Sequence, residues 1–193
     1  MKIVSAEFMV SAASAKQFPP PVLPEIAFLG KSNVGKSSLI NALLNRKSLV
    51  KTSGTPGKTR QVNFFLINNR FRFVDLPGYG FARVPQPERE AWQALCESYL
   101  SARENLRGVV MILDIRHEPP QLDQEMKAWL DHMGLTTLVV ANKADKLKRG
   151  EMVRALKAAA EALGLPAPPL AVSAKSNLGR DVLWKQIGAW LRG

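Results

Sequence analysis

The sequence predicts an α/β fold in which a mainly parallel sheet is covered by helices on both faces. Short, continuous apolar runs, such as VVMIL at 109–113 and LVVA at 138–141, alternate with longer amphipathic stretches. Strands that are apolar throughout are typical of parallel sheets, because both faces of such sheets are buried. One apolar run also leads directly into the glycine-rich turn GKSNVGKSS at 30–38, and a helical pattern follows that turn. Strand, glycine turn and helix in this order indicate a phosphate-binding α/β domain.

The elements follow from the spacing of the apolar residues. Continuous runs predict strands at IAFL (26–29), VVMIL, LVVA and LAV (170–172). Residues that recur every three or four positions predict four helices. The helical stripes are Leu39, Ile40, Leu43 and Leu44; Trp92, Leu95, Cys96, Tyr99 and Leu100; Leu122, Met126, Trp129, Leu130 and Met133; and Leu183, Ile187, Trp190 and Leu191.

A β-hairpin is predicted between the first helix and the second. The runs VNFFLI (62–67) and RFRFV (70–74) flank Asn68 and Asn69, a pair that tolerates positive φ. The alternation of Arg and Phe predicts that one face of the second strand is more exposed to solvent. The preceding segment, 46–60, is polar and basic without a sustained period, so we expect a loop there.

The composition predicts one folded domain over residues 1–193, with 1–24 as an N-terminal extension. The chain is 46% hydrophobic and 22% charged, which argues against global disorder. Its apolar runs are far shorter than the roughly 20 residues that cross a bilayer, and its single cysteine, Cys96, excludes an intrachain disulfide. We therefore expect a cytoplasmic protein with no membrane partner. The net charge of +11 favours a polyanionic partner.

Residues 30–37 match the pattern G-x-x-x-x-G-K-[ST], which binds nucleotide phosphates when it joins a strand to a helix. Its backbone N–H groups and the helix N-terminus face the phosphates. The Lys36 ammonium neutralises the β- and γ-phosphate oxygens, and the Ser37 hydroxyl ligates Mg²⁺. The predicted phosphate site consists of Gly30, Lys31, Ser32, Asn33, Val34, Gly35, Lys36, Ser37 and Ser38.

Two further motifs, NKAD and VSAK, each follow an apolar run and predict a guanine site. Guanine presents two adjacent donors, N1–H and the exocyclic amine, which the Asp145 carboxylate can accept together. Adenine would leave that carboxylate unpaired, so the motif favours guanine. Lys143 can lay its stem over the base, Asn142 can tie this loop to the phosphate loop, and the Ala174 N–H can donate to the guanine O6. The predicted base site consists of Asn142, Lys143, Ala144, Asp145, Val172, Ser173, Ala174 and Lys175.

The motif DLPG closes the second hairpin strand and predicts a nucleotide-sensing switch. Asp75 can reach the metal through a water, and the Gly78 amide can sense the γ-phosphate. In the preceding TPGKTRQ, Thr59 is the candidate for a second metal-ligating hydroxyl, and Thr55 is the alternative. The predicted metal ligands are Ser37, Thr59 and Asp75, and the predicted catalytic residues are Lys36, Thr59 and Gly78. The switch segments add Gly57, Lys58, Thr59, Arg60, Gln61, Asp75, Leu76, Pro77 and Gly78 to the nucleotide site.

The motifs GKSNVGKSS, TPGKTRQVNFF, DLPGYGFA, DIRH, NKAD and VSAKSN, in this order, resemble the EngB (YihA/YsxC) family of bacterial ribosome-biogenesis GTPases. This family is one of the TrmE-Era-EngA-EngB-Septin-like GTPases. The resemblance implies a P-loop NTPase three-layer α/β/α sandwich with a six-stranded, mostly parallel sheet and one antiparallel edge strand. It also implies Mg²⁺-dependent binding of GTP and GDP, a role in assembling the large ribosomal subunit, and a link to cell division and septation. Members often carry Thr where Asn142 stands, which leaves the guanine contact of Asp145 unchanged.

The position after DLPG predicts slow intrinsic hydrolysis. Many regulatory GTPases place a water-orienting glutamine there, whereas this chain has Tyr79. Gln61 does not replace that glutamine, because it lies before the hairpin. We therefore expect Lys36, Mg²⁺ and backbone amides to stabilise charge, and a partner to supply the rest.

Asn33, inside the phosphate loop, has two interpretations. It resembles the asparagine with which potassium-activated GTPases hold K⁺ beside the transferring phosphate. Alternatively, it is a turn residue that satisfies its own backbone.

The expected partner is the large ribosomal subunit or its rRNA, bound by a monomer without DNA specificity. Basic clusters at Arg46-Lys47, Lys51, 58–60 and 146–149 lie partly around the switch loop, so the nucleotide state could alter RNA affinity. Two alternatives remain open: an ATP-using P-loop enzyme such as a kinase, and an RNA-binding assembly factor whose nucleotide site is structural and does not turn over.

Overall fold

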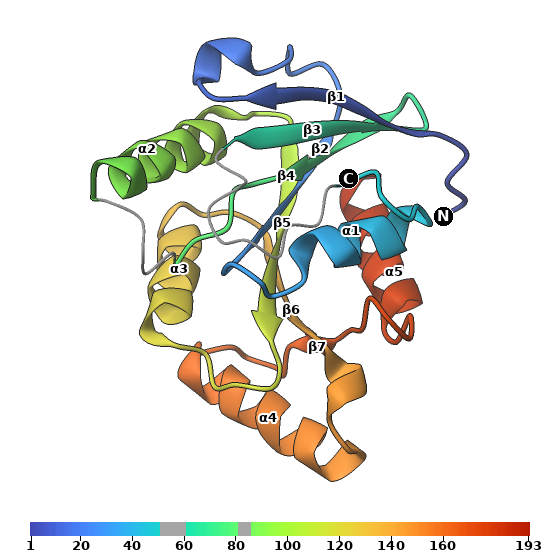
Figure 1. The fold of residues 1–193 in the computed structure, drawn as a ribbon, viewed down its shortest axis with the longest axis vertical. Helices are drawn as coiled ribbons and strands as arrows, with labels where there is room; N and C mark the ends of the chain where they lie inside the picture. Colours follow the sequence, from blue (N-terminus) through green and yellow to red (C-terminus); the bar gives the residue numbers. More distant parts are fainter. Residues whose placement is uncertain (51–60, 81–85) are drawn as a thin grey trace.

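A computed structural model describes residues 1–50, 61–80 and 86–193, except the side chains of 88 and 89, and confirms the α/β class (Figure 1). The described residues form one seven-stranded sheet in the order β1-β3-β4-β2-β5-β6-β7. The strands are β1 (Ala6–Ala12), β2 (Glu25–Gly30), β3 (Val62–Ile67), β4 (Phe71–Asp75), β5 (Leu106–Asp114), β6 (Thr137–Asn142) and β7 (Leu170–Ala171). The helices are α1 (Lys36–Leu44), α2 (Gln86–Ala102), α3 (Gln121–His132), α4 (Arg149–Ala162) and α5 (Arg180–Trp190), with 3-10 turns η1 (Ala15–Gln17) and η2 (Ala144–Lys146).

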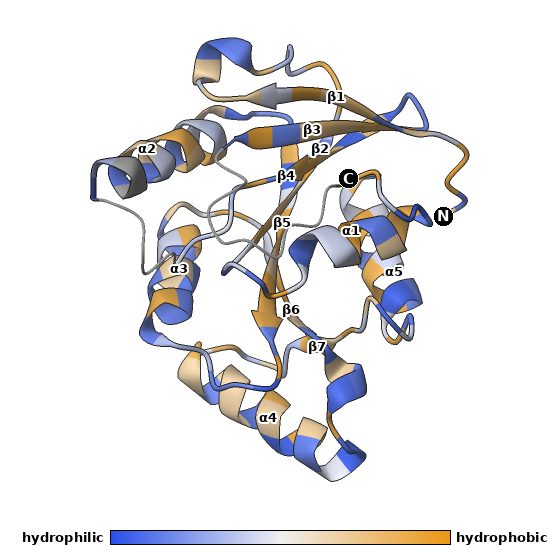
Figure 2. Cartoon of the chain, viewed as in Figure 1, coloured by the Kyte–Doolittle hydropathy of each residue, from blue (hydrophilic) through white to orange (hydrophobic). Residues whose placement is uncertain are grey.

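Helices cover both faces of the sheet, as predicted. Successive residues of β2 point to opposite faces, so that Ile26 and Phe28 pack in one core cluster and Ala27 and Leu29 in the other. The first cluster includes residues of α1 and α5, and the second includes residues of α2 and α3. Figure 2 shows the apolar residues concentrated along the strands between the helical layers. Within the described part of the chain, none of the helices combines the length and apolar character of a membrane span.

The sheet has one strand more than the six that the family resemblance implies. The additional strand is β1, which pairs with β3 from Ala6 opposite Ile67 to Ala12 opposite Val62, with an irregularity between Phe8 and Val10. Because β1 and β4 are both antiparallel to β3, β3 alone among the described strands runs against the others. The expected antiparallel strand is therefore present, but β1 covers it and takes the edge position.

The predicted hairpin of β3 and β4 is confirmed. Asn68 and Asn69 occupy its turn with φ of 52° and 53°, in the left-handed region that asparagine tolerates better than most residues. The Asn68 side chain also accepts hydrogen bonds from the N–H groups of Val4 (2.7 Å) and Ser5 (3.0 Å). The hairpin turn thus holds the segment that leads into β1.

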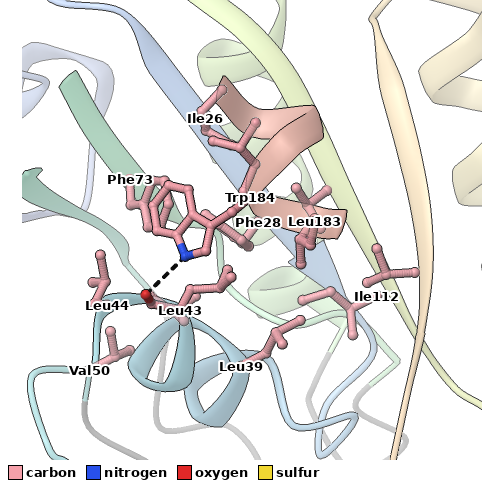
Figure 3. Close-up of a cluster of buried hydrophobic side chains, with 14 of the residues drawn as sticks. Ile26, Phe28, Leu39, Leu43, Leu44, Val50, Phe73, Ile112, Leu183 and Trp184 are labelled. Atoms are coloured by element: carbon pink, nitrogen blue, oxygen red, sulfur yellow. Dashed lines mark hydrogen bonds between the residues drawn. The ribbon is translucent and has the colours of Figure 1, made fainter. Parts of the chain in front are cut away.

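One tryptophan that the predicted stripes omit joins α5 to α1. The Trp184 indole N–H donates to the Leu43 carbonyl at 3.1 Å, and its ring stacks on Phe73 with 5.6 Å between centroids (Figure 3). The stripe predicted for α3 is wrong at Leu122, which is 46% exposed. Helix α4, which the sequence analysis did not identify, covers a small cluster around Ile115, Ala141 and Ala144.

The second hairpin strand, β4, does not have the more solvent-exposed face that the Arg residues predicted. Arg72 is only 3% exposed and donates to Glu25, which is fully buried, at 3.1 Å. The same carboxylate accepts from the Tyr99 hydroxyl at 2.9 Å and from the Arg103 guanidinium at 2.5 and 3.1 Å. Arg72 and Arg103 also donate to the carbonyls of Pro20 and Pro19. Glu25 therefore joins the start of β2 to β4, to the end of α2 and to the proline-rich approach.

Replacing Glu25 with glutamine should lower the free energy of unfolding by about 3 kcal/mol, because it removes one partner of a buried ionic network and leaves two guanidinium groups without their counter-charge. Urea denaturation of both proteins measures the change. The matched control is Glu161→Gln, which breaks an exposed pair with Lys157 at 3.8 Å and should cost less than about 1 kcal/mol. Equal losses in the two variants would contradict the prediction.

Candidate nucleotide-binding site

Apart from Gln61, the predicted site residues that the structure describes lie at the carboxyl ends of neighbouring strands or in the loops and the helix start that follow them. The phosphate loop follows β2, DLPG follows β4, NKAD follows β6 and VSAK follows β7. These strands are parallel, so their carboxyl ends share one edge of the sheet, where open α/β sheets bind ligands. Gly57, Lys58, Thr59 and Arg60, together with the alternative Thr55, lie outside the described residues. Gln61 is described and is exposed immediately before β3.

The phosphate loop depends on glycine at its two ends. A Cβ on Gly30 would lie 2.7 Å from the Ile112 carbonyl oxygen. Gly35, with φ of 91°, precedes α1, and a Cβ there would lie 2.6 Å from the Asn142 side-chain nitrogen. Both contacts are shorter than atoms tolerate, so the glycines allow the loop to approach β5 and the NKAD loop. The first turn of α1 thereby presents its N–H groups at this edge, as an anion site requires.

Lys36 and Asp75 form an ion pair at the centre of the site. Lys36 begins α1, Asp75 ends β4, and the ammonium contacts the carboxylate. Their side chains are only 9% and 2% exposed, so each charge depends on the other for compensation. The sequence motifs predicted a role for each residue but not this contact.

Ser37 and Asp75 offer the kinds of oxygen donor that Mg²⁺ uses. Ser37 lies in the first turn of α1, and Asp75 is 1% exposed at the end of β4. Over residues 1–50, 61–80 and 86–193, no three His, Cys, Asp or Glu side chains cluster as a metal site. A hydroxyl and a carboxylate, supplemented by water and phosphate oxygens, are the sparse oxygen set with which Mg²⁺ is usually held.

The segment after β4 lies against the phosphate loop. Leu76, Pro77 and Gly78 are buried, and a Cβ on Gly78 would lie 3.1 Å from the Ser32 hydroxyl oxygen. The Ser32 N–H donates to the Tyr79 carbonyl at 3.0 Å. The phosphate loop and the segment that begins with DLPG are therefore in direct contact.

The Tyr79 side chain faces the protein interior. It is 3% exposed, packs in the cluster between the sheet and α2, and its ring centroid lies 6.4 Å from that of Trp92. Burial, followed by the charge of Asp123, raises the pKa of Tyr79. The residue in place of a water-orienting glutamine thus has its hydroxyl in the core.

Asn142 connects the phosphate and base sides of the site. Its amide nitrogen donates to the Val34 carbonyl at 2.9 Å, and its amide oxygen lies 3.4 Å from the Ala174 nitrogen.

Asn33 has a positive φ of 67°, which supports its interpretation as a turn residue. Coordination of K⁺ by Asn33 stays a prediction.

Ser173 holds the Asp145 carboxylate in place. The Ser173 hydroxyl, in a residue only 2% exposed, donates to Asp145 at 2.6 Å. Its oxygen accepts the N–H groups of Lys175 and Ser176, both at 3.1 Å. The hydrogen bond from Ser173 lowers the pKa of Asp145, so the carboxylate remains a charged double acceptor at neutral pH. The sequence placed Ser173 in the site but did not indicate this orienting contact.

Lys143 spans the two sides of the site. Its ammonium donates to the Asn33 carbonyl at 2.7 Å and to the Asp114 carboxylate at 2.8 Å. The residue has φ of 66°, and its Cε lies 3.7 Å from the position of a Cβ on Gly35. Asp114, to which the sequence analysis gave no role, is thus part of the site's framework.

Residues 25–143 match the family described as "50S ribosome-binding GTPase". A probable GTP-binding protein EngB from Syntrophus aciditrophicus is 54% identical over 187 residues, which cover 97% of this chain and 95% of the relative. A second, from Pelotomaculum thermopropionicum, is 49% identical and covers 99% of this chain and 98% of the relative. The chain belongs to the EngB family of GTPases.

Solved structures agree with this EngB assignment. The crystal structure of a probable GTP-binding protein engB superposes with a TM-score of 0.73 and 27% identity, covering 87% of this chain and 98% of that one. A point variant of Aquifex aeolicus Era bound to GDP·AlF4⁻ has the same fold, with a TM-score of 0.70, 24% identity and coverage of 88% and 57%. Membership in a GTPase family confirms GTP hydrolysis and argues against the ATP-using alternative.

In this EngB-family chain, Ser173→Ala should weaken GDP binding about tenfold, because Asp145 loses the bond that orients it and two N–H groups lose their acceptor. Titration with fluorescent mant-GDP measures the change. Ser176→Ala, an exposed serine in the same loop, serves as the control and should bind as the parent protein does. An unchanged affinity in Ser173→Ala would show that Asp145 needs no support from Ser173.

Proposed function

We propose that this GTPase binds GTP and GDP with Mg²⁺ and acts in the cytoplasm as a switch in assembly of the large ribosomal subunit, on which normal division and septation depend. Residues 1–193 then act as one GTPase domain, with 1–24 as its N-terminal extension. The observation that carries the proposal is the Asp145 carboxylate, held by Ser173 on one side of a loop framework whose other side is the phosphate loop.

Guanine selection follows from the charge and position of Asp145. Its lowered pKa keeps both oxygens as acceptors, which matches the paired donors of guanine and opposes adenine. The Ala174 N–H, on the neighbouring loop, is the donor for the guanine O6. The hydrogen bond from this N–H to the Asn142 side-chain oxygen is long, at 3.4 Å. The guanine O6 can therefore replace the Asn142 oxygen as the acceptor at little cost.

Phosphate binding uses the N-terminus of α1 and Lys36. The N–H groups after Gly35 donate to the phosphates, and the Lys36 ammonium neutralises the β- and γ-oxygens. Ser37 and Asp75, the latter through water, would hold Mg²⁺, with Thr59 as the further ligand in the triphosphate state. When bound, the cation supplies charge neutralisation on the phosphates.

Hydrolysis depends mainly on electrostatic stabilisation in this chain. Lys36 and the backbone N–H groups stabilise charge on the transferring phosphoryl group, and the Gly78 amide registers the γ-phosphate. The buried Tyr79 hydroxyl leaves that position without a group to orient water. We infer that the protein alone hydrolyses GTP slowly and that its ribosomal partner completes the site.

The ribosomal partner is supported by charge and by family. The net charge of +11 favours association with phosphate-rich RNA, and the matched family is described as ribosome-binding. Since the DLPG segment contacts the phosphate loop, nucleotide exchange can change the surface offered to RNA. No DNA specificity or membrane partner is needed, and a monomer suffices for this role.

Binding to large ribosomal subunits should depend on the nucleotide. We expect co-sedimentation with isolated large subunits to be strongest with a non-hydrolysable GTP analogue and weak with GDP, and to decrease as salt rises, because phosphate contacts release counterions. Small subunits under the same conditions are the control. Equal binding in all nucleotide states would contradict the switch and favour an assembly factor whose nucleotide site is structural.

Single-turnover cleavage of GTP by the protein alone should be well below ~1 s⁻¹, because Tyr79 replaces the water-orienting glutamine and its side chain is buried. Rapid-quench measurement of phosphate release gives the rate. Large ribosomal subunits should accelerate it, whereas small subunits should not. Rapid cleavage without a partner would show that the chain completes its own catalytic site.

A further inference from the structure

Asp114, at the carboxyl end of β5, carries a clamp that the motifs of the nucleotide site do not include. The Arg116 guanidinium grips both carboxylate oxygens, with Nε 2.9 Å from Oδ1 and Nη2 2.7 Å from Oδ2. The Arg116 N–H adds a contact to Oδ1 at 3.2 Å. This two-point geometry fixes the plane of the carboxylate as well as its position.

The fixed carboxylate presents Oδ2 to Lys143. The Lys143 ammonium lies 2.8 Å from Oδ2 and 2.7 Å from the Asn33 carbonyl oxygen. Its stem therefore spans from the NKAD loop to the phosphate loop. Burial alone would raise the pKa of Asp114, but the hydrogen bonds from Arg116 and Lys143 hold it well below its usual range. The Asp114 carboxylate is therefore ionised at neutral pH.

We propose that Asp114 and Arg116 are positioning residues that hold the Lys143 stem in the conformation that receives the guanine base. A free lysine side chain samples many rotamers, and ordering it on binding weakens affinity. The clamp orders Lys143 beforehand. The inference rests on the proposed placement of guanine beside Lys143 and Asp145.

The clamp contributes little to the fold itself. Asp114 and Arg116 are two positions apart, so their pairing closes no long loop, and the Arg116 side chain is 41% exposed. Strand pairing already places Asp114 beside Asn142. Loss of the clamp should therefore leave the protein folded and change the nucleotide site.

Two substitutions distinguish positioning of the Lys143 side chain from a direct effect of charge on nucleotide affinity. Asp114→Asn removes a negative charge near an anion site, whereas Arg116→Gln removes a positive one, so a purely electrostatic effect would change nucleotide affinity in opposite directions. Positioning predicts that both variants weaken mant-GDP binding about tenfold, or about 1.4 kcal/mol, with faster dissociation. Arg116→Lys, which keeps the charge without the two-point grip, should recover only part of the affinity.

A double-mutant cycle tests whether the effect passes through Lys143. Lys143→Met keeps an apolar stem and removes the ammonium, so adding Asp114→Asn to it should weaken binding no further. Additive losses, or opposite shifts for Asp114→Asn and Arg116→Gln, would overturn the proposal. Asp131→Asn, at an exposed carboxylate that pairs with Lys127 on α3, is the charge control and should bind normally.

The readouts distinguish this inference from the proposed function. Thermal unfolding without nucleotide should be unchanged in Arg116→Gln, which would exclude a loss of fold. If the parent protein failed to prefer GDP over ADP, the guanine assignment itself would fail. If the parent preferred GDP and both clamp variants bound it as tightly, only the clamp proposal would fall.

Discussion

The hydrogen bond from the Asn142 amide to the Val34 carbonyl is the constraint on which the site depends. It is buried and 2.9 Å long, and it joins loops that are 108 positions apart in the chain. It requires Gly35, since a Cβ there would meet the same amide at 2.6 Å. The parallel sheet brings the two loops to one edge, and this bond fixes the distance between the end that can hold phosphates and the end that can hold a base. A rigid spacing of this kind suits a nucleotide of fixed length, because little reorganisation is needed on binding.

Much of the fold could be predicted because burial imposes local patterns. Strands β2, β5 and β6 each contain a continuous apolar run, and the Asn pair between β3 and β4 has the backbone freedom that its turn uses. Two features were missed for physical reasons. Helix α4 packs only three partly buried side chains, Met152, Ala155 and Leu156, on the cluster around Ala141, so its apolar stripe is short. Strand β1 is stabilised by pairing with β3, which is distant in the sequence. The predicted exposed face of β4 was wrong because the charge of Arg72 is compensated by Glu25, 47 positions away. A local sequence pattern contains no sign of such a partner.

In the candidate site, too, local motifs predict some residues, whereas contacts between distant residues could not be predicted. The motifs identify the groups that can face a ligand, because each group lies at a fixed offset from a strand end. They do not identify the groups that hold these residues in position through hydrogen bonds. Ser173 was placed in the site by its motif, yet its bond to Asp145 depends on how the β6 and β7 loops meet. Asp114 and Arg116 lie on a third strand end, and only the pairing of β5 with β6 brings them to Lys143.

The pairing of Lys36 with Asp75 links the binding of phosphate to the binding of a cation. A phosphate that attracts the Lys36 ammonium competes with Asp75 for it, and Asp75 is 1% exposed. A buried carboxylate that loses its counter-charge is destabilising by several kcal/mol. In the proposed function, a hydrated divalent cation beside Asp75 would restore the missing positive charge, and nucleotide and cation would each be bound more favourably when the other is present. Asp75 also begins the DLPG segment, and the backbone of Tyr79, which directly follows that segment, forms hydrogen bonds with Gly30 and Ser32 of the phosphate loop. In the proposed switch, the charge balance at this buried pair would thereby be coupled to the segment that distinguishes triphosphate from diphosphate.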